Sequence, residues 1–103
     1  MTSDLNLRNL NPPAELNYGQ PLARPDIDQL FNRVRKDDYT AFGRIFKANY
    51  ARLCAYSNRF VLNRQLAEEI VDDVFCNLWK NRKRIRISSS FQAYLITSVR
   101  NRS

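Results

Sequence analysis

Four carboxylates stand within a six-residue stretch of the 103-residue chain: Glu68, Glu69, Asp72 and Asp73. Clustered carboxylates can bind Mg²⁺, but these form two i, i+4 pairs on adjacent edges of a helix, with no nucleophile or phosphate-binding cation between them. The chain also has no histidine and no glycine-rich loop, so the commonest general base and the usual phosphate cradle are missing. The sequence therefore predicts a protein that is not an enzyme, with no catalytic residue, no metal and no cofactor.

The two cysteines are predicted to have neither a metal-binding nor a redox role. Cys54 and Cys76 are 22 positions apart, and without histidine they match neither a zinc set nor a CxxC redox pair. Each lies inside an apolar helical pattern, which predicts buried, reduced thiols in the core.

The net charge of +7 is confined to the end of the chain. The first 79 residues hold ten bases and ten acids, and no acid follows residue 79. The seven remaining bases are Lys80, Arg82, Lys83, Arg84, Arg86, Arg100 and Arg102. An acidic surface followed by a basic one predicts two different partners.

The acidic stretch has two interpretations. Acids near the N-terminus of a helix complement the helix dipole and need no further role. However, Phe75 and Trp79 continue the same surface with large apolar groups, and an acid cluster edged by aromatic side chains is typical of a docking site for a basic partner helix.

The basic stretch also has two interpretations. It can be a solubilising C-terminus, but its cations alternate with Ile85, Ile87, Phe91 and Tyr94, a combination that favours single-stranded nucleic acid. Asn101 adds a group that can hydrogen-bond a base edge. Phe91 and Tyr94 fit the helix core and a base-stacking role equally well.

Helical periodicity predicts how these residues are positioned. All four prolines and one of the two glycines lie within residues 1–25, which predicts a flexible arm over residues 1–24 and one all-α domain of about four helices over residues 25–103. Helices are expected at about 25–36, at 39–62 and from 91 to the end, with Asp37-Asp38 and Ser88-Ser89-Ser90 as capping sites. Asn63 makes a break, after which a third helix carries Leu66 to Trp79, with an unclear end in residues 80–84, and 84–87 is expected to be a loop.

The expected core residues follow the same periodicity. They are Phe42, Ile45, Phe46, Leu53, Tyr56 and Phe60 on the second helix and Leu66, Ile70, Val74 and Leu78 on the third. The sequence has neither a run of about 20 apolar residues nor a signal peptide, which predicts a cytoplasmic protein without membrane insertion.

Three blocks of sequence, in order, carry a family resemblance. They are Asp38-Tyr39-Thr40-Ala41-Phe42, then Ala67 to Trp79 (AEEIVDDVFCNLW), then Phe91-Gln92-Ala93-Tyr94-Leu95 with Arg100-Asn101. Together they resemble region 2 of bacterial RNA polymerase sigma factors, most closely those of the extracytoplasmic-function (ECF) class. The resemblance covers about residues 27–103.

The resemblance implies a transcription initiation factor with two partners. The first is core RNA polymerase, whose largest subunit has a clamp coiled coil that would bind Glu68, Glu69, Asp72, Asp73, Phe75 and Trp79. The second is the single-stranded nontemplate strand of the promoter minus-ten element, with bases flipped into protein pockets. The implied DNA-binding residues are Lys83, Arg84, Arg86, Ser88, Ser89, Ser90, Phe91, Tyr94, Arg100 and Asn101.

Some features depart from the family pattern. Many relatives carry Asp at the position of Glu69 and Gln at that of Asp72. Relatives also continue beyond the position of Ser103 into a second helix-turn-helix domain (region 4), so the chain is expected to be a truncated part of a longer factor. An anti-sigma factor is a further candidate partner. The alternatives are a generic helical nucleic-acid-binding module and a protein-interaction bundle.

Overall fold

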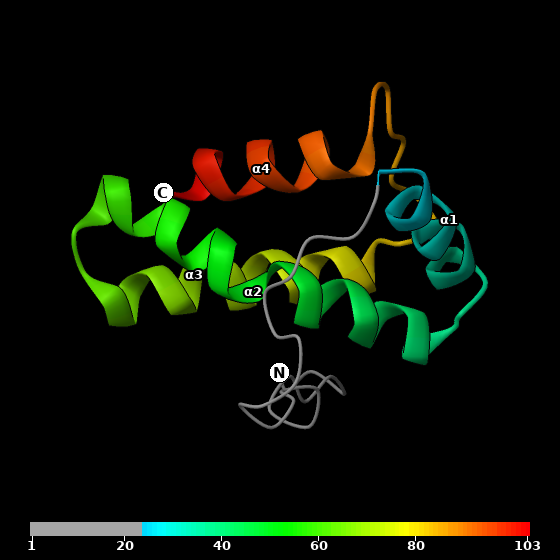
Figure 1. Cartoon of the computed structure of the whole chain (residues 1–103), viewed down its shortest axis with the longest axis horizontal. Helices are drawn as coiled ribbons and strands as arrows, with labels where there is room; N and C mark the ends of the chain where they lie inside the picture. The colour runs from blue at the N-terminus through cyan, green and yellow to red at the C-terminus, as the bar shows by residue number, and fades with distance from the viewer. Residues whose placement is uncertain (1–23) are drawn as a thin grey trace.

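The computed structural model describes residues 24–103, which form four α-helices: α1 (Arg24–Arg35), α2 (Tyr39–Val61), α3 (Arg64–Lys80) and α4 (Phe91–Arg102). The arm predicted for residues 1–24 lies outside the described residues, except for Arg24. Helices α2 and α3 form a long hairpin, α4 packs along it, and α1 lies across the end of the hairpin opposite the α2–α3 turn (Figure 1). The all-α prediction is confirmed.

Side-chain caps start three of the helices, and two of them, Asp38 and Ser90, belong to the capping sites predicted from sequence. Asp38 Oδ1 accepts a hydrogen bond from the Ala41 amide at 3.0 Å. Asn63 Oδ1 accepts one from the Leu66 amide at 3.0 Å, and Ser90 Oγ accepts one from the Ala93 amide at 3.2 Å. Each cap satisfies an amide that has no partner within its helix. The segment between α3 and α4 is a loop, as expected.

The core joins all four helices, but two residues expected in it are exposed. Phe42, Ile45, Phe46 and Leu53 of α2 are buried, as are Ile70, Val74 and Leu78 of α3. Phe60 and Leu66, by contrast, are exposed, with 50% of the Phe60 surface accessible. Both flank the α2–α3 turn, at the end of the hairpin away from α1 (Figure 1), so the predicted periodicity extends beyond the region that a third helix covers.

The cysteines are free thiols, but they are half-buried rather than buried. Burial raises the pKa of Cys54 to about 11 and also raises the pKa of Cys76. Within residues 24–103, no group of His, Cys, Asp and Glu side chains is arranged to hold a metal ion, and no helix is long and apolar enough to cross a membrane.

Candidate functional site

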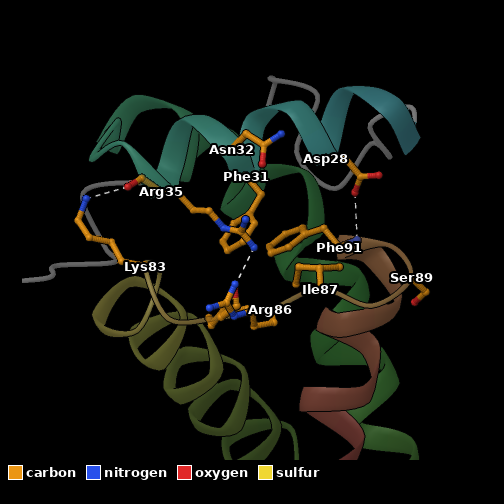
Figure 2. A pocket seen from close by; sticks show the side chains of 10 residues that line it. Asp28, Phe31, Asn32, Arg35, Lys83, Arg86, Ile87, Ser89 and Phe91 are labelled. Atoms are coloured by element: carbon orange, nitrogen blue, oxygen red, sulfur yellow. Dashed lines mark hydrogen bonds between the residues drawn. The ribbon is translucent and has the colours of Figure 1, made fainter.

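A cleft of about 420 Å³ lies between α1 and the loop that joins α3 to α4. Helix α1 forms one wall and the loop forms the other (Figure 2). The lining residues are Asp28, Phe31, Asn32, Arg35, Lys83, Ile85, Arg86, Ile87, Ser89 and Phe91. The cleft therefore combines three cations with two aromatic rings and three other polar side chains.

Contacts from α1 hold both ends of the loop. Near its start, Arg35 Nη2 donates a hydrogen bond to the Ile85 carbonyl at 2.8 Å, while the guanidinium lies 4.7 Å from the Phe31 ring centroid. At its end, Asp28 Oδ1 accepts a hydrogen bond from the Phe91 amide at 3.0 Å (Figure 2). The rings of Phe31 and Phe91 stack at 4.4 Å between these two points. The walls of the cleft are thus joined by polar contacts and by the core itself.

Lys83, Arg86, Ser89 and Phe91 are the predicted DNA-binding residues that line this cleft. The base-stacking role predicted for Phe91 is wrong, because its ring is 1% exposed and belongs to the core. The prediction that Ser90 contacts DNA is also wrong. Ser90 is 5% exposed, and its hydroxyl accepts the hydrogen bond that caps α4. Tyr94 is partly buried and its ring stacks on Phe91 with centroids 6.2 Å apart.

The other predicted DNA-binding residues lie in two places. Arg84 and Ser88 are exposed on the loop, whereas Arg100 and Asn101 are exposed on the last turn of α4. Nine residues separate Phe91 from Arg100, so the helical rise places the second group about 14 Å further along α4. The structure does not bring the predicted set into a single pocket.

The four acids lie along α3, on two edges of the helix. Glu68 is 3.7 Å from Arg64 of the same helix, and Asp73 is 4.0 Å from Arg102 of α4. Asp72 faces α2: burial, together with hydrogen bonds and the nearby charges of Cys54 and Asp72, raises the pKa of the Tyr50 phenol above its usual range. Glu69 and Asp73 are exposed, so they present the most accessible carboxylates.

The two aromatic residues predicted to extend this acidic surface behave differently. The prediction for Phe75 is wrong, because its side chain is 0% exposed and packs edge-on against Phe42 and Phe46. It lies one helical step from the acids, on the face that α2 covers. Trp79 is partly exposed and packs edge-on against Tyr39, with the Arg82 guanidinium 4.0 Å from its ring centroid.

Sequence reasoning missed the contribution of α1 to the cleft. Asp28, Phe31, Asn32 and Arg35 line it, but they are about 50 residues from the loop in sequence. The pattern of α1 showed only an apolar stripe with polar residues between, which is typical of any surface helix. No local signal marks those polar residues as functional.

The comparisons with known proteins agree with the residue pattern. The family model for sigma-70 region 2 matches residues 45–103, more than half of the chain. Neither the search of curated proteins nor that of solved structures gives a significant match. The matched segment contains most of α2 and all of α3, the loop and α4, which are the elements that carry the acids and one wall of the cleft. This chain therefore belongs to the sigma-70 region 2 family of transcription initiation modules, whose general role is to bind core RNA polymerase and recognise promoters.

Proposed function

We propose that this chain docks on core RNA polymerase through the acids of α3 and holds the nontemplate strand of the minus-ten element in the cleft beside the loop. The activity is assigned to one helical domain, residues 25–103, acting in the cytoplasm. The cleft is the observation that carries this proposal, because it places cations, hydrogen-bonding groups and room for a small planar group on the segment matched by the family.

The cleft suits a base that has left its stack. Its volume lies in the range typical of small-ligand sites. Asp28, Asn32 and Ser89 offer acceptors and donors for a base edge. Arg86 lines the cleft and Arg84 is exposed on the same loop, so both can neutralise phosphates. Extruding a base costs a few kcal/mol of unstacking, so these contacts must offset that cost.

Arg100 and Asn101 are exposed at the end of α4 away from the cleft. The distance of about 14 Å from the cleft to Arg100 and Asn101 corresponds to about four nucleotides of a strand at 3.4 Å each. A single strand that enters the cleft and follows α4 would therefore reach both groups. This accounts for the separation of the predicted DNA-binding residues without a second pocket.

The docking proposal rests on charge and exposure. Glu69 and Asp73 are exposed on α3, and Trp79 is a partly exposed aromatic side chain at the C-terminal end of the same helix. Phe75 makes no direct contribution, because the core covers it. The clamp coiled coil of the largest polymerase subunit is the proposed target, a basic partner helix whose cations would pair with the acids.

Charge reversal tests the docking. The Glu69→Lys/Asp73→Lys variant is expected to bind core polymerase at least about tenfold more weakly, since like charges would replace attractive ones at the interface. Asp26→Lys, which reverses an exposed acid on α1, is the control and should bind normally. Circular dichroism checks that each variant is folded. Retained binding by the folded double variant would contradict the docking proposal.

Binding to oligonucleotides tests the DNA role and separates the alternatives. The chain bound to core polymerase should prefer one single-stranded sequence, selected from a random pool, over its scrambled version. A generic nucleic-acid binder would bind both equally, with a strong dependence on salt and without polymerase. A pure protein-interaction module, such as one captured by an anti-sigma factor, would bind neither strand at low salt.

A further inference from the structure

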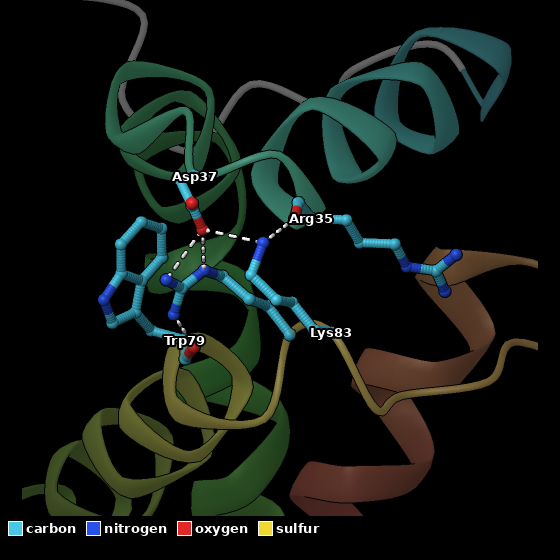
Figure 3. Close-up of polar contacts among 5 residues, drawn as sticks. Arg35, Asp37, Trp79 and Lys83 are labelled. Carbon is cyan, nitrogen blue, oxygen red and sulfur yellow. Dashed lines mark hydrogen bonds and ion pairs between the residues drawn. The ribbon is translucent and has the colours of Figure 1, made fainter.

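We propose that Asp37 is a positioning residue that fixes the loop in the arrangement that forms the cleft, an inference that rests on the proposed function. Asp37 lies in the turn between α1 and α2, about 45 positions from the loop. Its Oδ1 atom accepts hydrogen bonds from Arg82 Nη2 at 2.8 Å and Arg82 Nε at 3.0 Å, and it is 3.1 Å from Lys83 Nζ (Figure 3). One carboxylate oxygen thus contacts two consecutive residues near the start of the loop.

Arg82 transfers this contact to the end of α3. Its Nη1 donates a hydrogen bond to the Trp79 carbonyl at 2.6 Å, and its guanidinium lies 4.0 Å from the Trp79 ring centroid. The carbonyls of the last helical turn have no partner within the helix. The Arg82 side chain donates a hydrogen bond to the Trp79 carbonyl and is itself bound to Asp37. The α1–α2 turn therefore sets the direction in which the chain leaves α3.

Lys83 closes a second connection, to α1. Its Nζ donates a hydrogen bond to the Arg35 carbonyl at 2.8 Å (Figure 3). The Arg35 side chain in turn donates a hydrogen bond to the Ile85 carbonyl. Residues 83 and 85 are therefore both bound to Arg35. Since the ammonium of Lys83 already contacts Asp37 and Arg35, we assign Lys83 to anchoring the loop rather than to contacting phosphate.

The backbone conformation at position 37 also favours an aspartate. Its φ angle is 72°, in the left-handed region that Gly, Asn and Asp tolerate best. The residue lies in the turn between α1 and α2, and its carboxylate contacts the loop. Isolated surface ion pairs contribute little, but one carboxylate shared by two cations in a hydrogen-bonded network is a more favourable case. The hydrogen bonds from Arg82 and Lys83 lower the pKa of Asp37, which keeps it ionised.

Asp37→Asn is the sharpest variant, because asparagine keeps the left-handed backbone and removes the charge. Asp26→Asn is its control, since it removes an exposed acid on α1 that is not one of the residues lining the cleft. Each is measured as the full chain bound to core polymerase, against the selected single strand and its scrambled version. Both variants should bind the scrambled strand as well as the wild type does. Only Asp37→Asn should lose preference for the selected strand, by about tenfold.

The outcomes distinguish this inference from the proposed function. If the wild-type complex shows no preference between the strands, the proposed function fails and the inference fails with it. If the wild type has a preference and folded Asp37→Asn keeps it, the inference alone is overturned. Trypsin adds a readout without DNA: cleavage after Arg84 should be faster in Asp37→Asn than in Asp26→Asn, and equal rates would overturn the inference.

Lys83→Gln tests the anchoring role separately. Loss of a phosphate contact lowers the slope of log affinity against log salt by about 1. Loss of an anchor leaves the slope unchanged and reduces the preference for the selected strand. An unchanged preference with a reduced slope would show that Lys83 contacts phosphate, which contradicts the role assigned to it here.

Discussion

Replacing Phe75 separates folding from docking. Its ring is 0% exposed and lies 6.0 Å from the Phe42 ring and 5.1 Å from the Phe46 ring. Phe→Ala in a core costs about 3–5 kcal/mol, and a domain of 80 residues has a total stability of about 4–12 kcal/mol. Phe75→Ala is therefore expected to remove about half of the stability of the domain. Phe75→Leu keeps most of the volume and should cost about 1.5 kcal/mol or less.

Urea unfolding followed by circular dichroism measures these costs. With a slope of about 1 kcal/mol per molar urea, Phe75→Leu should lower the midpoint by about 1 M and leave polymerase affinity unchanged. Phe60→Leu, at a half-exposed position, should change stability by about 0.5 kcal/mol or less. If Phe75→Leu weakened polymerase binding tenfold with an unchanged midpoint, its ring would contact the partner, and the assignment to the core would be refuted.

Three further outcomes are expected. Ser90→Ala removes the cap of α4 and should lower stability by about 1 kcal/mol in urea unfolding; an unchanged midpoint would contradict the cap. Hydrogen bonds from Arg82 and from the Ala41 amide lower the pKa values of Asp37 and Asp38 below 3.8, so their stabilisation is complete above that pH and is lost as the pH falls below it. Thermal unfolding should show this acid decline, and Asp37→Asn should reduce it. In a Cys76→Ser background, iodoacetamide labelling of Cys54 should be slow at pH 8 and rise about tenfold per pH unit up to pH 10, since its pKa is about 11; rapid labelling at pH 8 would contradict that pKa.

Local signals predicted the helices well. Asp38, Asn63 and Ser90 cap the first amides of three helices. The preference of these residue types for the N-cap position depends only on a few consecutive residues. The order of acidic and basic segments was equally visible. The loop between α3 and α4 was predicted because an alternating four-residue segment has no strand to pair with.

Side-chain orientation was harder to predict, because it depends on which faces the neighbouring helices cover. Phe75 and Trp79 are four positions apart and belong to the same general side of α3, yet α2 buries the first and leaves the second partly exposed. Apolar periodicity marks a core stripe but does not indicate how far along a helix the neighbouring helices extend. Phe60 fits the periodicity of α2 and is nevertheless half-exposed.

The cleft could not be predicted, because its walls are distant in sequence. Arg35 reaches Ile85 across 50 positions, and Asp37 reaches Arg82 across 45. Nothing in either segment signals the other, since a basic residue near a helix C-terminus is explained by the helix dipole alone. Only tertiary packing reveals that these charges hold the loop.

Trp79 is the single tryptophan of the chain, and its position gives the protein an intrinsic optical probe. The indole lies beneath the Arg82 guanidinium and beside Tyr39, where the acidic helix meets the loop. A guanidinium held against an indole alters the emission that the ring would have in water, so movement of Arg82 changes the fluorescence. Movement of the start of the loop can therefore be followed in real time on the unlabelled chain, with excitation that selects one residue.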